Sequence, residues 1–410
     1  MVTKVVIQTT ISRALVALAL GLVLGLGFVG CGDDEASGPE VVAQFEAVCE
    51  GGAGGGELAI ERHISSLGPS AHEMAFDGQG LWVVESGANR VSRFDVEDQT
   101  MESGALDVGA ERNPYDLAID EEKGRLWVTN FLSDTVSVFD GESRELVEEL
   151  DYGVFENPSS VVIHGDYAYV GSVNYQGSQG FGPGSIAVVD RQSLELKGEV
   201  ETVFRNPHFM AVHEIGGRAH LVVSSSGELD QSGDRVRVEG SGGLEIFDLD
   251  EGGMERVSFA MGQAEVETVG APGKTWLNEE RGRLYMVSGI APALFVFDVE
   301  ERVWIHDALD PLWLVEDGEE HGDATHRAAL DEEGLLWVTS FNDDELHVID
   351  TACDRKVTDA IDLGEAAHML EGAQAIEVID RGERREIYYA RSIANAMGRL
   401  LYIPHGDSDE

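Results

Sequence analysis

The sequence predicts an all-β protein, a seven-bladed β-propeller of four-stranded blades in which an N-terminal strand completes the last blade. Short apolar runs alternate with polar turns along most of the 410 residues, in the period-two pattern of half-buried antiparallel strands. A unit of such strands recurs seven times at intervals of roughly 40 to 65 residues, a period typical of propeller blades. A further strand-like segment precedes the first unit and has no partner there.

The second unit, Asn113–Asp140, shows the pattern most clearly. Its three alternating runs are separated by an acidic turn at Gly124 and a polar turn at Asp134. The unit ends in an apolar–aspartate pair, Phe139-Asp140, and such a pair closes the third strand of the first six units. The middle strand of each unit has a large apolar anchor residue: Trp82, Trp127, Tyr169, Leu221, Tyr285, Trp337 and Tyr388.

The two ends of the repeat region predict how the ring closes. After Ile403 only a short tail remains, so the seventh unit has no fourth strand of its own. The unpaired segment is Glu57–Leu67, and as the outer strand of the seventh blade it would remove the exposed sheet edges. The alternative is a free N-terminal strand. The propeller is therefore expected over residues 57–406, followed by an acidic tail at 407–410.

The charge balance excludes one class of partner. The chain has 77 acidic and 28 basic residues, and its formal net charge is -49. A field of this sign repels phosphate backbones, so nucleic acid is not expected as a partner. Cations, cationic ligands and basic protein surfaces remain compatible with it. High charge also keeps an exported protein soluble.

The first 30 residues are expected to be a signal peptide. Lys4 and Arg13 precede the apolar run Ala14–Val29, as in secretory signals. The run Phe28–Cys31 resembles the bacterial lipobox, with Phe28 where leucine is usual, and implies cleavage before Cys31 and lipid on its thiol. The alternative is an ordinary signal peptide. We expect an exported protein anchored by lipid to the bacterial cell envelope, at the outer membrane, facing the periplasm or the cell surface.

Residues 31–56 are expected to form a glycine-rich linker between the lipidated cysteine and the propeller. The segment Val42–Val48 within it is compatible with a helix of one or two turns. The two other cysteines, Cys49 and Cys353, can form one disulfide in an oxidising compartment. Cys353 begins the outer strand of blade 6 and Cys49 precedes the outer strand of blade 7, so neighbouring strands bring them together. Two unrelated buried thiols are the alternative.

The runs at residues 126–140 and 336–350 resemble the YVTN repeat of the YncE-like seven-bladed propellers, which are related to NHL and streptogramin-lyase-type propellers. The resemblance covers roughly Glu57–His405. Blade 4 departs from it at Leu221 and in a long insertion, and blade 7 lacks the closing aspartate. The resemblance implies the fold strongly and the chemistry weakly, because propellers carry unrelated functions on one scaffold.

By the same resemblance, the loops that lead into the first strands and out of the second strands share one face around the central channel. One column of first-strand residues contains three histidines, in blades 1, 4 and 6: His72, Tyr115, Ser159, His208, Gly273, His326 and Gln374. The evenly spaced His72, His208 and His326 predict a site for zinc, copper or iron at the axis. Weaker candidate ligands in nearby loops are His321 and His368. Structural or incidental histidines are the alternative.

Other polar residues are expected on the same face. Glu85 and Asp116 are candidate catalytic bases. Candidate ligand-binding residues are Asn130, Asn174, Lys274, Arg327, Asn342 and Arg391. Two long insertions frame this face, Asn174–Gly184 and Ser224–Gly243, and long loops on a rigid scaffold commonly carry binding. A calcium site is also conceivable in the second insertion, from Glu228, Asp230 and Asp234, although their spacing does not match an EF-hand.

Three classes of function follow. The interpretation that we favour is a monomeric, exported binding module for a small-molecule ligand or an envelope protein. The alternative is a metal-dependent enzyme, a hydrolase, lyase or oxidoreductase, with the histidines at the central channel. The third is a structural envelope protein without a small-molecule site.

Overall fold

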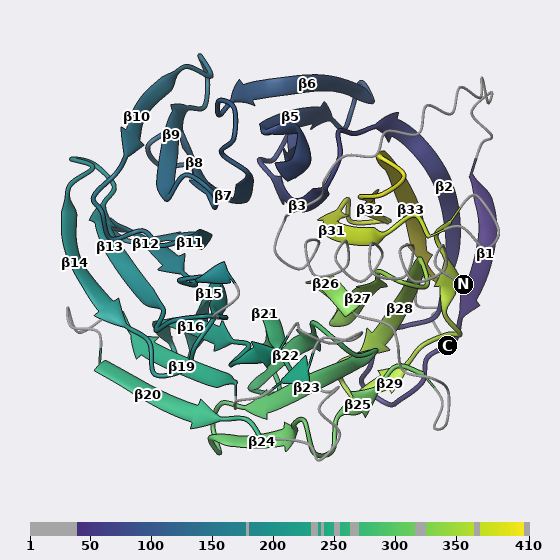
Figure 1. Ribbon diagram of the computed structural model, residues 1–410. Coiled ribbons are helices and arrows are strands. Elements are labelled where there is room, and N and C mark those ends of the chain that lie inside the picture. Colours follow the sequence, from purple (N-terminus) through teal and green to yellow (C-terminus); the bar gives the residue numbers. More distant parts are fainter. Residues whose placement is uncertain are drawn as a thin grey trace, which may run out of the picture.

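A computed structural model describes residues 39–177, 180–230, 237–238, 242–249, 255–262, 270–315, 325–364 and 370–405. Seven antiparallel sheets stand side by side in a ring around a central axis (Figure 1), which confirms the predicted seven-bladed propeller. Apart from one 3-10 turn, η1 (Ser86–Ala88), the described residues form strands, turns and loops. Among the described residues no helix has the length and hydrophobicity needed to cross a bilayer.

Each of the first six blades runs outward from the axis, its first strand innermost. The strands of blades 1 to 3 are β3 (Ala71–Phe76), β4 (Gly80–Glu85), β5 (Arg90–Asp95), β6 (Thr100–Asp107), β7 (Pro114–Asp120), β8 (Arg125–Asn130), β9 (Thr135–Asp140), β10 (Leu146–Leu150), β11 (Pro158–His164), β12 (Tyr167–Ser172), β13 (Ser185–Asp190) and β14 (Leu196–Glu201).

Blades 4 to 6 add short extra strands to this pattern. Blade 4 carries a two-stranded hairpin in its insertion, and blades 5 and 6 each have a second short strand at the outer edge. The strands are β15 (Pro207–Ile215), β16 (Arg218–Ser225), β17 (Leu229–Asp230), β18 (Arg237–Val238), β19 (Gly243–Asp248), β20 (Glu255–Ala260), β21 (Pro272–Asn278), β22 (Arg283–Ser288), β23 (Ala293–Asp298), β24 (Val303–His306), β25 (Leu312–Trp313), β26 (Thr325–Leu330), β27 (Leu335–Ser340), β28 (Glu345–Asp350), β29 (Arg355–Lys356) and β30 (Ile361–Asp362).

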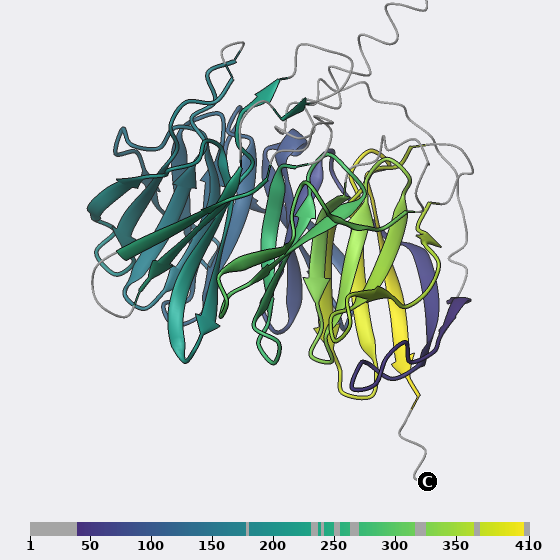
Figure 2. The same cartoon turned by 90° about the horizontal axis from the view of Figure 1, so that it is seen from below.

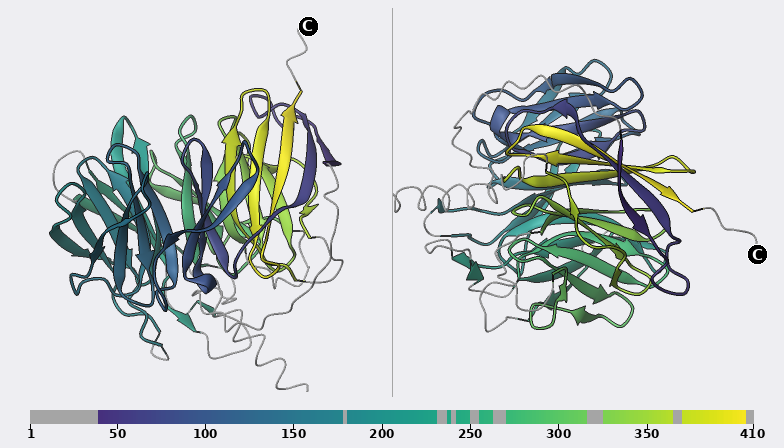
Figure 3. Two further views of the ribbon diagram at one scale, coloured as in Figure 1. Left: turned by 90° about the horizontal axis from the view of Figure 1, so that it is seen from above. Right: turned by 90° about the vertical axis from the view of Figure 1, so that its right-hand side faces the viewer.

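Blade 7 joins the two ends of the chain, as predicted. Its inner strands are β31 (Ala373–Asp380), β32 (Arg385–Arg391) and β33 (Ala396–Pro404). The N-terminal strand β2 (Gly56–Ser66) pairs antiparallel with β33, from Gly56 opposite Pro404 to Ser66 opposite Ala396. Figure 3 shows these two strands side by side at the closure. The ladder between them removes the free edges that an open ring would leave.

The segment before β2 differs from the expected linker and helix. Residues Glu40–Phe45 form a strand, β1, which pairs with β2 as a fifth strand of blade 7. Its register, Phe45 opposite Gly56, places the buried Phe45 ring 5.1 Å from Tyr402 and 6.0 Å from Trp337. The edge of a sheet with an apolar groove beside it favours strand pairing over a short isolated helix.

The recurring aspartates have a local role in the turns. Asp140 Oδ1 accepts hydrogen bonds from the backbone N–H groups of Glu142 (3.2 Å) and Ser143 (2.7 Å). Asp190 and Asp298 accept the equivalent pairs of N–H bonds in their own blades. An aspartate at the end of a third strand therefore satisfies the backbone of the turn into the fourth strand.

A second repeated feature fixes where the inner strands begin. Asn113, Asn157 and Asn206 each precede a proline and have left-handed backbones, with φ of 52°, 56° and 58°. Asparagine tolerates this conformation better than most residues. The Asn113 carbonyl accepts the N–H of Phe131, just beyond the second strand, and the other two asparagines make the same contact in their blades. The carbonyls of Ser70, Ala271 and Gly372 accept the equivalent N–H groups in blades 1, 5 and 7. In these six blades the start of the inner strand is thus held at a fixed height along the axis.

The loops divide the disc into two faces. We call the face with the long connections between second and third strands the loop face; its largest connections are residues 173–184 and 226–242. Figure 2 shows the β17–β18 hairpin protruding from this face, while β33 ends toward the opposite one.

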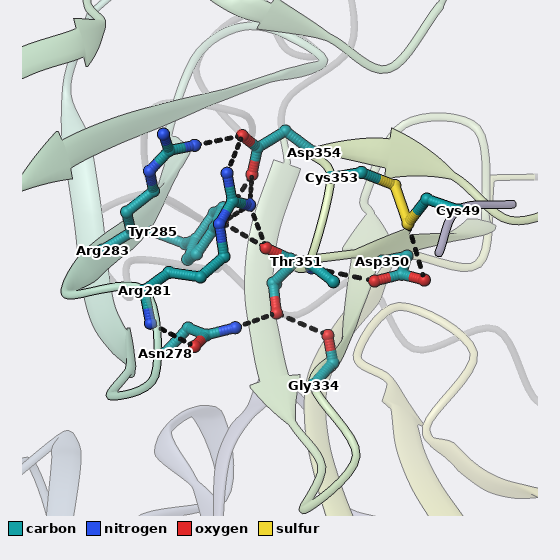
Figure 4. A network of polar contacts seen from close by, with 11 residues as sticks. Cys49, Asn278, Arg281, Arg283, Tyr285, Gly334, Asp350, Thr351, Cys353 and Asp354 are labelled. Carbon is teal, nitrogen blue, oxygen red and sulfur yellow. Dashed lines mark hydrogen bonds and ion pairs between the residues drawn. A yellow bond between two sulfur atoms is a disulfide. The ribbon is translucent and has the colours of Figure 1, made fainter. Parts of the chain in front are cut away.

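Cys49 and Cys353 form a disulfide between the segment after β1 and the turn after β28, with their Cα atoms 6.4 Å apart (Figure 4). Asp350 lies beside the bridge and accepts the N–H of Ala53 at 3.1 Å. The disulfide thereby attaches the glycine-rich segment to blade 6. The next strand along the chain, β2, belongs to blade 7. The bridge spans the same closure as the β2–β33 ladder.

Figure 4 also shows how blade 5 is tied to blade 6. Asp354, in the turn after β28, accepts hydrogen bonds from Arg281 (2.9 Å), Arg283 (2.5 Å) and the Tyr285 hydroxyl (2.5 Å). Asn278 donates to the Thr351 hydroxyl at 2.7 Å. The disulfide and this network lie on either side of one turn of blade 6.

Candidate functional site

The inner strands bring five ionisable side chains from five blades to the central channel. Each lies near the start or middle of its strand, so the fixed height of the strands sets their relative positions. We call them the channel cluster: Glu73 of β3, Asp116 of β7, Lys274 of β21, Arg327 of β26 and Glu377 of β31.

Glu73 is the centre of the cluster. One carboxylate oxygen accepts a hydrogen bond from Arg327 Nε at 3.1 Å, and the other lies 3.5 Å from Lys274 Nζ. The Arg327 guanidinium also stacks 4.7 Å from the centre of the Phe209 ring. The side chains of Glu73 and Arg327 are 10% and 6% exposed, whereas that of Lys274 is 36% exposed. Lys274 is therefore the cation that a molecule in the channel could reach.

The pKa values of the ion pair follow from burial and charge. Burial alone would raise the pKa of Glu73, but Lys274 and Arg327 outweigh it, so its pKa lies below the ordinary value. The Glu73 carboxylate in turn raises the pKa of Lys274, against the effect of burial. Both groups are ionised at neutral pH.

The other two carboxyl groups behave differently. Burial, together with the nearby charge of Glu73, raises the pKa of Asp116 to about 6, although the N–H groups of Val161 (2.8 Å) and Leu117 (2.9 Å) bind its oxygens. Burial raises the pKa of Glu377 to about 7, and Lys274 opposes that rise. The charge of the channel cluster therefore changes across the neutral range, from about +1 in acid toward −1 in base.

Tyr115 and two histidine rings adjoin the cluster. Tyr115 stands between two histidines, with ring centres 4.6 Å from His72 and 5.2 Å from His208, and its hydroxyl is hydrogen-bonded to His208 Nε2. Burial, aided by Arg327, lowers the pKa of His72 to about 4, so its ring is neutral under ordinary conditions. His72 Nδ1 contacts the Ser86 hydroxyl at 2.9 Å, while its buried Nε2 has no hydrogen-bond partner.

Two cavities border the channel cluster. One has room for about one water molecule and lies among Glu73, Tyr115, Asp116 and Ser160. The other has a volume of about 130 Å³ and lies between blades 5, 6 and 7. Its charged lining residues are Glu73, Lys274, Arg327 and Glu377, and its apolar lining residues are Trp276, Ala328, Ala329, Leu330, Ile376 and Val378.

The structure bears on the predicted histidine site only in part. His72 and His208 do reach the channel wall, but Tyr115 separates their rings. The backbone of His326 lies in β26, but its side chain, like the whole of His321 and His368, lies outside the described residues. The three-histidine metal site stays a prediction. Among the described residues one group has the spacing of metal ligands, Cys49, Asp350 and Cys353, and both of its sulfurs are in the disulfide.

Three candidates at the ends of second strands brace the blades internally. The Glu85 carboxylate accepts the N–H of Gly68 (2.7 Å) and the hydroxyl of Ser92 (3.0 Å) and pairs with Arg90. Asn130 donates to the hydroxyls of Thr135 and Ser137. Arg391, 1% exposed, pairs with Glu371 and donates to the carbonyl of Arg62. None of these three joins the channel cluster.

The remaining candidates lie in loops. Asn174 donates to the Pro183 carbonyl and shapes the blade 3 insertion, whose Phe181 packs with Tyr115, Phe131 and Val173. Asn342 is half-buried in the turn after β27. Among the suggested calcium ligands, Glu228 pairs with Arg205, while the side chain of Asp230 and the whole of Asp234 lie outside the described residues. Cys31 and the acidic tail at 407–410 also lie outside them.

Of the predicted polar residues, Asp116, Lys274 and Arg327 come together. The column of first-strand residues does not predict Glu377, which lies four positions into β31. The sequence does contain a signal for Glu377. The residues two positions after Glu73, Asp116 and Arg327 in their strands are alanines, and the equivalent residue of blade 7 is Glu377. The equivalent residues of blades 3, 4 and 5 are Val162, Ala211 and Trp276, so Glu377 is the one charged residue in this row. A charged residue in an otherwise uncharged row around a channel is worth testing as a site residue.

Comparisons with known proteins support the fold alone. No known protein family and no curated protein matches the sequence. The structure is similar to a solved structure of Kuenenia stuttgartiensis hydrazine synthase (TM-score 0.60, 15% identity, 83% of this chain and 97% of that one). It is also similar to a streptogramin B lyase (TM-score 0.56, 9% identity, 84% and 98%) and to virginiamycin B lyase from Staphylococcus aureus (0.55, 11%, 84% and 98%). These likenesses agree with the resemblance to streptogramin-lyase-type propellers.

Proposed function

We propose that this protein is an exported, lipid-anchored binding module that takes a small polar ligand into its central channel from the loop face. The observation that carries the proposal is the channel cluster, whose five ionisable groups come from five blades and border two neighbouring cavities. The β-propeller is commonly a binding scaffold, with its ligands held near the axis or on the loops of one face.

The cost of burying these groups supports a functional role. Taking ionised groups out of water is unfavourable, and well-packed apolar side chains stabilise a fold as well or better. Blades 3 and 4 show that the ring does not need charges at this height: the residues equivalent to Glu73 and Asp116 are Ser160 and Phe209. A cluster that the fold does not require is best explained by what it binds.

Export is supported by separate features. The first 30 residues have the pattern of a secretory signal, and Cys31 follows a run that resembles a lipobox. The disulfide between Cys49 and Cys353 fits an oxidising compartment. Metabolic labelling with a palmitate analogue tests the anchor: label should appear on the wild-type protein and be absent from the Cys31→Ser variant.

A ligand screen tests the binding function. The thermal unfolding of the purified protein is followed in the presence of single small molecules, both charged and neutral. Lys274→Met serves as the channel variant, and Lys197→Met, which changes an exposed lysine on β14, as the matched control. We expect at least one compound to raise the Tm of wild type and of Lys197→Met but not of Lys274→Met. A screen in which Lys274→Met responds like wild type to every ligand found contradicts a channel site.

A second function has one observation in its favour. Asp116 and Glu377 have pKa values of about 6 and about 7, the range in which a carboxyl group acts efficiently as a general acid or base. An acid–base enzyme acting on a ligand in the channel is therefore the alternative. Once a ligand is known, turnover that is lost in both Asp116→Asn and Glu377→Gln, with binding retained, would establish it.

A further inference from the structure

The cavity of about 130 Å³ between blades 5, 6 and 7 has two chemically different ends. Lys274 and Arg327 supply two positive charges on one side, and a single carboxylate, Glu73, contacts both of them. The rest of the lining is apolar and includes Trp276, Ile376 and Val378. While Glu377 and Asp116 are protonated, the two cations exceed the one carboxylate. A lining of this charge with apolar residues beside it matches a molecule that has an anionic group and a short hydrocarbon part.

We propose that this cavity binds a small organic monocarboxylate, with its carboxylate on Lys274 and Arg327 and its hydrocarbon part against Trp276 and Ile376. This inference rests on the proposed function, since it names the ligand class of the same channel. Lys274 is the residue that decides binding, because its side chain is accessible whereas Arg327 is buried against Glu73 and Phe209. A charge-assisted contact between an ammonium group and a carboxylate is among the stronger polar interactions in proteins.

Glu377 gives the site a pH dependence. It lines the same cavity, and the charged groups that face it are Lys274 on β21, Arg327 on β26 and Glu73 on β3. When Glu377 and the more distant Asp116 are protonated, the two cations exceed the one remaining carboxylate, so an anion neutralises the cluster. When both are ionised, they repel the anion. Binding of a monocarboxylate is therefore coupled to proton uptake by the cluster.

The test uses three probes of one shape: butyrate, butylammonium and 1-butanol. Titrations are followed by isothermal calorimetry and by Trp276 fluorescence, with Trp276→Phe to assign the optical signal. We expect butyrate to bind wild type and Lys197→Met alike, and Lys274→Met at least about tenfold more weakly. Butylammonium and butanol should bind at least about tenfold more weakly than butyrate. Circular dichroism of each variant confirms that it is folded.

Proton coupling is tested on the same proteins. Wild type should bind butyrate about tenfold more tightly at pH about 6 than at pH about 8, and Glu377→Gln should lose most of that difference. Equal binding of all three probes, or butyrate binding that Lys274→Met leaves unchanged, overturns the inference. The proposed function survives that result if the wider screen yields another ligand that depends on Lys274. If no compound of any class binds in the channel, both fail.

Discussion

Removal of the disulfide should destabilise the closed ring measurably. The bridge joins residues 304 positions apart, so its loss frees most of the chain in the unfolded state. In the chain-entropy treatment a loop of this length corresponds to about 5.7 kcal/mol, and measured bridges commonly contribute about 2–4 kcal/mol. We therefore expect Cys49→Ser/Cys353→Ser to lose about 3 kcal/mol of unfolding free energy.

The expected loss converts to a modest change in melting temperature. Unfolding entropy is about 2.1 cal/mol/K per residue, which gives roughly 0.7 kcal/mol/K for a folded body of about 350 residues. A loss of about 3 kcal/mol then lowers the Tm by about 4 °C. The strands β1 and β2 should stay paired, because the ladder between them and the Asp350 contact to Ala53 do not depend on the bridge.

Scanning calorimetry with and without reductant makes the comparison. Reductant should lower the Tm of wild type to that of the double serine variant and should leave the variant unchanged. If the variant melts within about 1 °C of wild type without reductant, the bridge does not stabilise the fold by constraining the unfolded chain. If reductant lowers the Tm of the variant as well, the effect on wild type is not due to the Cys49–Cys353 bond.

Three further predictions concern single side chains. Asp354→Asn should lower the unfolding free energy by about 1.5–3 kcal/mol in chemical denaturation, because two arginines and Tyr285 lose a charged acceptor. The control Asp359→Asn changes an exposed side chain and should lower it by nothing measurable. Equal losses would contradict the role of the blade 5–6 network. His347, 1% exposed, makes no hydrogen bond through either ring nitrogen, and its Nε2 lies 3.8 Å from a carboxylate oxygen of Glu345. Burial lowers its pKa to about 4, so its contribution to stability is lost as the pH falls from 6.5 to 4. His347→Leu should stabilise the protein and reduce its loss of Tm in acid, and an unchanged acid profile would refute this. Burial raises the pKa of Glu377 from 4.5 to about 7, so its contribution to stability is present below pH 4.5 and lost as the pH rises to 7. Glu377→Gln should therefore reduce the fall in Tm between pH 4.5 and 7. A fall as steep as in wild type would show that another group titrates there.

The fold could be predicted from the sequence because the signals for it are local and repeated. The alternation, the aspartate that ends the third strand of six blades and the unpaired segment before the first blade each correspond to a backbone interaction in the structure, such as the Asp140 turn and the β2–β33 ladder. The strand β1 was not predictable in the same way. It forms because the edge of β2 and a groove beside Trp337 are available to it, and both depend on tertiary structure.

The site was only partly predictable. The alignment of first strands places Asp116, Lys274 and Arg327 at equivalent positions, and in the structure they lie together at the channel. Glu85 and Arg391 were expected on the same face from the loops after the second strands. The last residue of a second strand instead makes contacts with its own blade and the preceding loop. Nothing in a one-dimensional pattern distinguishes a side chain that faces the axis from one that braces a blade.

The central claim is that the charges in the channel serve binding and not folding. The most direct measurement is the unfolding free energy of Glu73→Gln/Lys274→Met/Arg327→Met, together with its response to any ligand that stabilises wild type. We predict an unfolding free energy within about 1 kcal/mol of wild type, or above it, and no ligand response, because a buried ion cluster can be replaced by apolar groups without loss of stability. A loss of about 3–5 kcal/mol with the ligand response intact would show that the cluster is structural and that the ligand binds elsewhere.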